Sequence, residues 1–99
     1  MQIAIYGEQS DDALIKHLRN LIYPALEKFT NSVEKVTLYW KSETLNQDPT
    51  RYACCLHLSF FDHQVAETTC WAEDLSGAAR KSADLAARLA ARCHSEKKR

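Results

Sequence analysis

Four cysteines and four histidines are the residues of this 99-residue chain whose side chains could do chemistry. Both residue types are common zinc ligands, and a histidine beside a cysteine can activate the thiol as a nucleophile. Structural zinc sites usually combine two pairs of ligands, each pair about two to four residues apart. The eight residues are Cys54, Cys55, Cys70, Cys93, His17, His57, His63 and His94.

The spacing of these residues argues against a metal site. Cys54 and Cys55 are neighbours in a predicted strand, so their side chains point to opposite faces. Cys55 and His57 share a face, but their nearby candidates are only His63 and side chains across the hairpin. We therefore predict no metal site, and we interpret Cys54 and Cys70 as small buried hydrophobic residues.

The sequence also predicts neither a disulfide nor an enzyme. Disulfides are rare in a reducing cytoplasm, and we interpret Cys55 as an exposed, oxidisable thiol. With two glycines the chain has no glycine-rich phosphate loop, and no Ser, His and acid stand in a recognisable elbow. His57 could activate Cys55 in principle, but a surface strand residue is the simpler interpretation. We expect no catalytic residue and no cofactor.

Positive charge is concentrated in the C-terminal part of the chain. The whole chain is neutral, with 13 basic and 13 acidic residues. From residue 74 onward seven basic residues stand against three acidic ones, which gives this part a charge of +4 and leaves −4 for the rest. Such a local basic field favours an anionic partner. The other interpretation is a solvated helix face followed by a polar tail.

The basic residues belong to one long predicted helix, which begins after Asp74 and runs to about residue 94. Asp74 is a good N-cap because its carboxylate can accept the free N–H groups of the first turn. Apolar and small residues recur at helical spacing, and alanine is the best helix former. This apolar face consists of Leu75, Ala78, Ala79, Ala83, Ala86, Leu89 or Ala90, and Cys93. The opposite side carries Arg80, Lys81, Asp84, Arg88 and Arg92.

The first part of the chain predicts a strand, a helix and a second strand. Residues 2–6 alternate between apolar and other side chains, which is typical of a short half-buried strand. Ser10 is the predicted N-cap of a helix whose apolar stripe contains Leu14, Leu18, Leu21, Ile22 and Ala25. Pro24 lies inside this stripe, so we expect the helix to kink or restart there. Residues 35–41 alternate again, and their strand would bury Val36, Leu38 and Trp40.

Two further strands precede the final helix. Residues 42–50 are polar, contain Pro49 and predict a loop. Residues 51–61 predict a strand that buries Cys54, Leu56, Leu58 and Phe60, and residues 65–71 predict a fourth strand. The outward side chains of the strands include Tyr6, Tyr39, His57, Phe61 and Trp71. Exposed aromatics either stack on unpaired bases or mark a protein interface, and the few basic residues on the strands favour an interface.

The predicted order β-α-β-β-β-α defines an α+β domain. A four-stranded sheet with two helices packed on one face buries all the apolar stripes, as in double-stranded-RNA-binding (dsRBD-like) folds. Short connections predict an antiparallel meander of the last three strands, and the helix between the first two lets them lie parallel. We place a single domain at residues 1–95 and a basic tail at residues 96–99. Without a membrane-spanning apolar run or an N-terminal signal peptide, the chain is expected in the cytoplasm.

Three short stretches carry a resemblance to a known family. They are MQIAIYG at residues 1–7, LHL at residues 56–58, and AEDL at residues 72–75, which leads into an alanine-rich helix with a basic end. Together they resemble the bacterial ribosome hibernation-promoting factors, also known as ribosome-associated inhibitors or sigma-54 modulation proteins. The resemblance covers nearly the whole chain, in the same order of elements and at the length of the short form.

The resemblance implies a function in translation. Proteins of this family bind the small ribosomal subunit in the channel used by messenger and transfer RNA, and they silence idle ribosomes in stationary phase or cold. They contact ribosomal RNA mainly through basic residues on the two helices. Carried onto this chain, the candidate RNA-binding residues are Arg19, Lys28, Arg80, Lys81, Arg88, Arg92, Lys97 and Lys98. Of these, Arg88, Arg92 and the two tail lysines fall where the family's last helix is basic.

The chain departs from the family pattern at both helices. The family's Asp-Met-Tyr lead into the last helix is Asp74, Leu75 and Ser76 here, so the tyrosine is missing. The first helix lacks the lysines that the family carries in its second half, and the loop before it is shorter. These departures keep a second hypothesis open. It is a non-catalytic protein-interaction module that has lost ribosome binding and uses its sheet face for a homodimer or a protein partner.

Overall fold

A computed structural model describes residues 1–8, 11–44 and 51–97, with side chains described up to residue 92. The element order is β1 (Gln2–Tyr6), α1 (Asp12–Leu26), the short 3-10 helix η1 (Glu27–Phe29), β2 (Val33–Glu43), β3 (Arg51–Phe60), β4 (Val65–Ala72) and α2 (Leu75–Lys97). The predicted order β-α-β-β-β-α and the α+β class are therefore confirmed. No helix within the described ranges is both long and apolar enough to span a bilayer.

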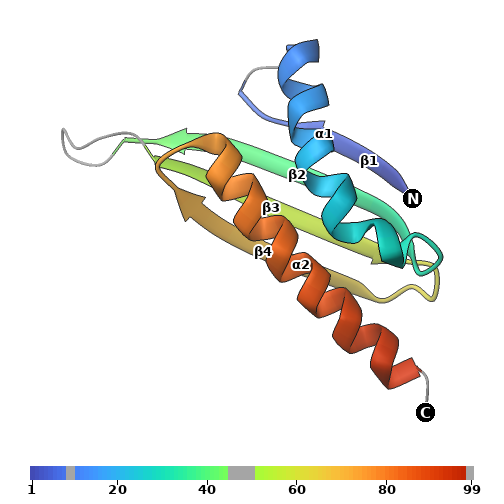
Figure 1. The fold of residues 1–99 in the computed structure, drawn as a ribbon. Helices are drawn as coiled ribbons and strands as arrows, with labels where there is room; N and C mark the ends of the chain where they lie inside the picture. The colour runs from blue at the N-terminus through green and yellow to red at the C-terminus, as the bar shows by residue number, and fades with distance from the viewer. Residues whose placement is uncertain (9–10, 45–50, 98–99) are drawn as a thin grey trace.

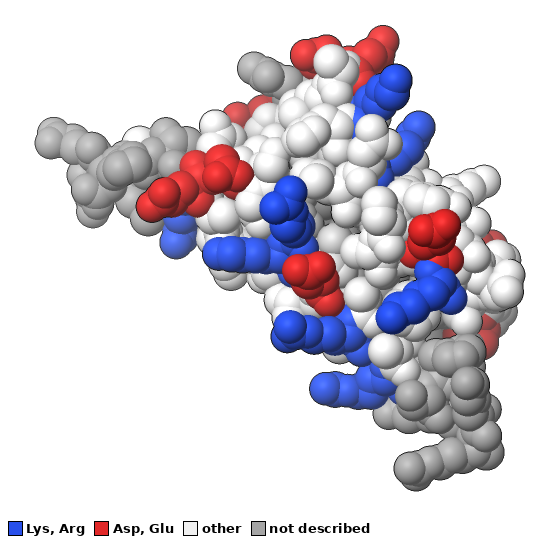
Figure 2. All heavy atoms as spheres, in the orientation of Figure 1, with Lys and Arg blue, Asp and Glu red and all other residues white. Residues whose placement is uncertain are grey.

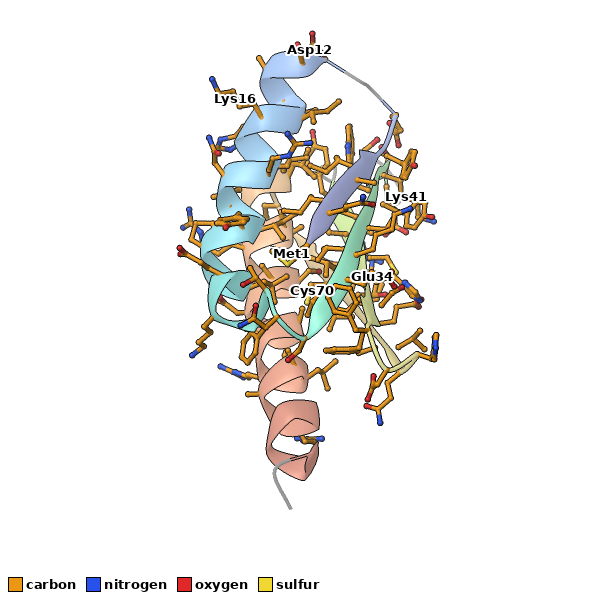
Figure 3. All side chains as sticks on the ribbon, turned by 90° about the vertical axis from the view of Figure 1, so that its right-hand side faces the viewer. Met1, Asp12, Lys16, Glu34, Lys41 and Cys70 are labelled. Carbon is orange, nitrogen blue, oxygen red and sulfur yellow. The ribbon has the colours of Figure 1, made fainter. Side chains whose placement is uncertain are left out.

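The four strands form one sheet in the order β1-β2-β3-β4. β1 runs parallel to β2, whereas β2, β3 and β4 pair antiparallel, as predicted from the connections between them. Both helices cover the same face of this sheet (Figure 1). In the side view, Cys70 lies between the sheet and α2, whereas Lys41 projects from the opposite side (Figure 3). We call that opposite side the open face.

Strand register decides which side chains belong to the open face. Successive residues of a strand alternate between faces, and partners across strands share a face. The open face therefore includes Tyr6 of β1, Lys35, Tyr39, Lys41 and Glu43 of β2, Arg51, Ala53, Cys55 and His57 of β3, and Val65, Glu67, Thr69 and Trp71 of β4. The other face meets the helices and forms the core.

The core lies between the sheet and the helices, and it contains the predicted inward residues. Cys54, Leu56, Leu58 and Phe60 of β3 are at most 2 % exposed. The stripe of α1 belongs to the same core cluster, with Leu18 and Ile22 fully buried and Leu14, Leu21 and Ala25 partly buried. Cys54 and Cys70 are buried free thiols, as we interpreted them, and Cys55 is half-buried.

Small side chains let α2 lie close to β3 and β4. Its five buried alanines are at most 1 % exposed: Ala78, Ala79, Ala83, Ala86 and Ala90. Asp74 caps the helix as predicted, because its carboxylate accepts a hydrogen bond from the N–H of Gly77. The helix continues to Lys97, which is beyond the end near residue 94 that the apolar spacing predicts.

Two details of α1 differ from the sequence prediction. The N-cap is Asp11, whose carboxylate accepts the N–H of Ala13 at 3.1 Å, while the predicted cap Ser10 lies outside the described residues. The helix continues through Pro24 to Leu26, so the predicted restart is wrong, whereas the alternative of a kink stays a prediction. Proline removes the bond to the carbonyl of Asn20, and this residue is exposed, so water can replace the lost donor.

The predicted loop at residues 42–50 is wrong at its beginning, because β2 continues through Glu43. The N–H of Ser42 donates to the Glu8 carboxylate at 2.7 Å, and Arg51 Nε donates to the Glu43 carboxylate at 2.9 Å. These polar contacts stabilise an extension of the strand that apolar alternation does not indicate. Residues 45–50 of the predicted loop lie outside the described residues.

Candidate nucleic-acid interface

Four exposed cations of α2 form one basic stripe: Arg80, Lys81, Arg88 and Arg92. At about 100° per residue, they lie within an arc of about 120°, opposite the buried alanines. Figure 2 shows Lys and Arg side chains gathered along the exposed side of this helix. The sequence predicted this sidedness, and the structure confirms that the four side chains reach solvent together.

An acidic residue and an exposed leucine interrupt the basic stripe. Asp84 lies one turn before Arg88, so it reduces the local positive charge without cancelling it. A shallow groove between α2 and β4 is lined by Cys70, Lys81, Asp84, Leu85 and Arg88. Lys81 Nζ donates to the backbone carbonyl of Trp71 at 3.5 Å, which places this cation at the edge of the sheet. The stripe therefore borders the edge strand β4.

The other predicted RNA-binding residues lie on the same side of the sheet or at the end of α2. Arg19 on α1 and Lys28 in η1 are both exposed, and Lys28 Nζ lies 5.5 Å from the ring centroid of Phe29. The two helices lie side by side, and a hydrogen bond of 2.7 Å joins His17 Nε2 of α1 to Ser76 Oγ of α2. Lys97 ends α2 with its side chain outside the described part, and Lys98 lies outside the described residues.

Cations of the stripe are available to a partner. The ion pairs that the described part of the chain shows both involve Glu43, on the open face, and neither engages α2. Arginine presents a planar fork of N–H donors that matches a phosphate, and lysine acts as a compact point charge. The stripe can therefore bind phosphates without any covalent chemistry.

A second surface is the aromatic side of the open face, which the sequence also predicted. Large exposed hydrophobic residues gather there: Tyr6, Tyr39, Phe61, Val65 and Trp71. The rings of Tyr6 and Tyr39 stack with centroids 5.4 Å apart. Trp71 is 45 % exposed, so its indole does not fold into the core. Of the remaining predicted outward residues, His57 is half-buried.

The sequence did not indicate an ion cluster beside these aromatics. Glu43 pairs with Arg51 at 2.9 Å and with Lys41 Nζ at 3.6 Å, and the Arg51 guanidinium lies 5.6 Å from the ring centroid of Trp71. The hydrogen bond from Arg51, assisted by the charges of Arg51 and Lys41, lowers the pKa of the Glu43 carboxyl. Glu43 therefore stays ionised at neutral pH and pairs with both cations, of which Arg51 lies over the indole.

The cysteines and histidines do not assemble into a site in the described part of the chain. No three His, Cys, Asp or Glu residues there come close enough to hold a metal ion. Burial, with smaller effects of Cys70 and Cys55, raises the pKa of the Cys54 thiol to about 12, so this thiol stays protonated. The side chains of Cys93 and His94 are outside the described part.

The fold belongs to a recognisable structural class, the β-α-β-β-β-α domain with both helices on one side of a four-stranded sheet. A solved ribosomal subunit interface protein from Coxiella burnetii matches it with a TM-score of 0.72 and 11% identity, over 96% of this chain and 99% of that chain. The N-terminal domain of Thermus thermophilus Protein Y matches with a TM-score of 0.67 and 12% identity, over 93% of this chain and 98% of that chain.

The comparisons of sequence alone add no match, either among models of protein families or among curated proteins. At 11% and 12% identity, the two structural matches establish the fold across nearly the whole chain. The resemblance predicted from the sequence is thereby confirmed at the level of structure.

Proposed function

We propose that this protein binds the small ribosomal subunit and inactivates idle ribosomes in the cytoplasm, as ribosome hibernation factors do. The observation that carries the proposal is the exposed basic stripe on α2, on the helix that the family resemblance assigns to RNA contact. The fold supports it, since one of the matching structures is described as a ribosomal subunit interface protein.

The proposed contact is electrostatic and mainly with the phosphate backbone of ribosomal RNA. Arg88 and Arg92 lie one helical turn apart on one side, so both can address a single RNA strand. Arg80 and Lys81 extend the same stripe and add affinity through the release of counterions. Further contributions come from Arg19 and Lys28 on the neighbouring helix and from Lys97 and Lys98 at the end of the chain.

The proposed inhibition is steric. A domain seated in the decoding channel would exclude messenger and transfer RNA by occupying their space. This function requires no catalytic residue and no cofactor, and it places the protein in the regulation of translation under stress.

The test is co-sedimentation with purified small ribosomal subunits at low and at physiological salt. We expect the wild type to pellet at low salt, with affinity falling steeply as salt rises. Reversing two charges in Arg88→Glu/Arg92→Glu should weaken binding at least tenfold and make the log–log salt slope shallower by about 1.5. Both residues are exposed, so the urea midpoint should not change.

Arg92→Glu alone should already weaken binding, and a single charge reversal on the open face is its matched control. Lys35→Glu changes the net charge as much as Arg92→Glu does, but on the side of the sheet away from the stripe. Lys35→Glu should bind within about twofold of the wild type. Failure of the wild type to pellet at either salt, salt-independent binding, or full binding by the double variant would each reject the proposal.

A further inference from the structure

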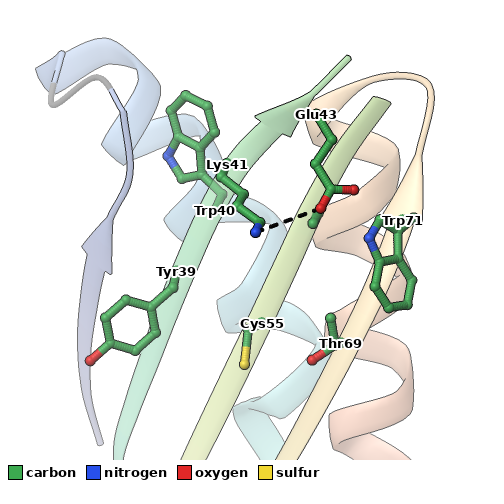
Figure 4. A pocket seen from close by; sticks show the side chains of 8 residues that line it. Tyr39, Trp40, Lys41, Glu43, Cys55, Thr69 and Trp71 are labelled. Atoms are coloured by element: carbon green, nitrogen blue, oxygen red, sulfur yellow. Dashed lines mark ion pairs between the residues drawn. The ribbon is translucent and has the colours of Figure 1, made fainter. Parts of the chain in front are cut away.

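The open face carries a hollow that the proposed ribosome contact does not use. Ala53 lies near the beginning of the inner strand β3, with Lys41 as its partner on β2 and Trp71 as its partner on β4. Because Ala53 has only a methyl group, the longer side chains on both neighbouring strands rise around it. They enclose a hollow of about 270 Å³ that extends over Cys55 and Thr69 (Figure 4).

From this arrangement we propose that the open face binds single-stranded RNA, with one unpaired base seated in the hollow beside Trp71. Pockets for drug-sized ligands usually measure about 300–1,000 Å³, so this hollow suits a single planar ring. Trp71 and Tyr39 both line it, and they are 45 % and 52 % exposed. Their rings offer the flat apolar surfaces on which unpaired bases stack.

The neighbouring tyrosines provide a place for a second base. Tyr6 stacks on Tyr39 with an angle of 21° between the ring planes, and Tyr39 lines the hollow, so a base beside Tyr39 would extend an existing stack of rings. Successive bases of a single strand can stack on successive aromatic side chains, whatever their sequence. The open face therefore matches a run of nucleotides better than an isolated ring.

Charge at the rim of the hollow favours RNA over an apolar protein side chain. Lys41 and Arg51 share one carboxylate, that of Glu43, so the cluster keeps an excess positive charge. Arg51 also lies over the indole of Trp71, at 5.6 Å from the ring centroid. A nucleotide carries both a flat base and a phosphate, and it can satisfy the aromatic wall and the cationic rim together.

The inference is independent of the proposed ribosome site, because the stripe of α2 lies on the other side of the sheet. RNA binding can therefore be measured in the Arg88→Glu/Arg92→Glu background, where contact through α2 is weakened. The probe is fluorescein-labelled hexauridylate, followed by fluorescence anisotropy at low salt. In this background, loss of binding on substitution of Trp71 would assign the oligonucleotide to the open face even if the ribosome proposal failed.

Substitution of Trp71 is the decisive change. In that background, Trp71→Ala should weaken hexauridylate binding about tenfold or more, because stacking on one aromatic side chain is worth about 1–3 kcal/mol per base. Trp71→Phe should retain most of the affinity. The matched control is Tyr23→Ala, which removes a 42 % exposed aromatic from α1 and should leave binding unchanged.

Cys55 gives a second readout that needs no change in the aromatic wall. Its half-buried thiol lies in the hollow, whereas Cys54 and Cys70 are buried. With Cys93→Ser added, N-ethylmaleimide should label Cys55 alone, and hexauridylate should slow this labelling over the same concentrations that raise the anisotropy.

Several results would overturn the inference. One is no binding of hexauridylate in the charge-reversed background, and another is Trp71→Ala that binds hexauridylate as tightly as this background does. A third is a double-stranded RNA of the same length that protects Cys55 as well as hexauridylate does. Equal protection by uridine monophosphate at the same nucleotide concentration would indicate a mononucleotide site instead. A dimer seen by light scattering that shields Cys55 without RNA would indicate a protein interface, as the sequence alone had favoured.

Discussion

Gly7 and Trp40 are far apart in the sequence, but the backbone of Gly7 lies directly against the indole ring of Trp40. A Cβ atom added to Gly7 would overlap the indole ring of Trp40, at Nε1 and its neighbouring carbons. The backbone of Gly7 does not have a positive φ, so glycine is required here for close approach and not for conformation. Trp40 is buried on the helix side of the sheet, and Gly7 lets the chain after β1 pass directly against its ring.

We therefore expect Gly7→Ala to lower the free energy of unfolding in urea by about 1–3 kcal/mol, which is typical of an overpacked site. In a Trp40→Val background the same substitution should be less damaging, because the indole atoms that overlap the new methyl group all lie beyond Cγ and are gone. The double-mutant cycle measures this coupling directly. An equal loss in both backgrounds would show that the indole is not the cause.

At the scale of elements, the two ends of β2 are set by features other than the alternation of apolar and polar residues. β2 begins at Val33, and a bulge between Val33 and Lys35 lets both Val33 and Val36 face the core despite their odd spacing. The far end of β2 is held by Glu8 and Arg51, both polar. Strict alternation therefore predicted a strand that is too short at both ends.

A buried serine attaches α2 to the sheet. Ser82 is fully buried, its hydroxyl donates to the carbonyl of Cys54 at 2.9 Å, and its own carbonyl accepts the hydroxyl of Thr68 at 3.2 Å. The helix is thus linked by hydrogen bonds to both β3 and β4. The apolar face predicted for this helix did not include Ser82, so the sequence indicated neither its burial nor its polar contacts.

Ser82→Ala should lower the free energy of unfolding by about 1 kcal/mol, because the variant loses one buried hydrogen bond while its methyl group still fits. The control is Ser76→Ala in the same helix, whose exposed bond to His17 should contribute less. Both variants gain similarly in helix propensity, so their difference in urea unfolding isolates the buried bond. Equal values for the two variants would contradict this role of Ser82.

At the scale of the whole molecule, the sheet separates two surfaces of different character. The side with the helices carries the basic stripe and Arg19 and Lys28, whereas the open face carries the aromatics and the ion cluster on Glu43. A neutral chain can thus present a cationic surface to one partner and a stacking surface to another. The prediction of a homodimer or protein partner on the open face stays a prediction.

The division into a domain at residues 1–95 and a basic tail can be tested by truncation. A chain ending at Ser95 should unfold within about 0.5 kcal/mol of the full chain, because the ends of helices contribute little to global stability. It should bind small subunits more weakly, with a shallower salt slope, since Lys97, Lys98 and Arg99 are removed. A large loss of stability would show that the last residues belong to the folded domain.

The sequence by itself determined the order of the elements, the buried residues of β3, the apolar face of α2 and the sidedness of its cations. These features depend on periods of two and 3.6 residues, which are local properties of a strand and a helix. Much of the candidate interface could therefore be predicted, namely the α2 stripe and the outward aromatics of the strands.

Only the tertiary structure decided the contacts that depend on register between distant segments. The hollow over Ala53 exists because this alanine has Lys41 and Trp71 as partners, and no local pattern contains that information. The same holds for the close approach of Gly7 to Trp40 and for the hydrogen bond from the Ser82 hydroxyl to the carbonyl of Cys54. Each of these contacts joins residues far apart in the chain, so it arises only when the strands and helices pack.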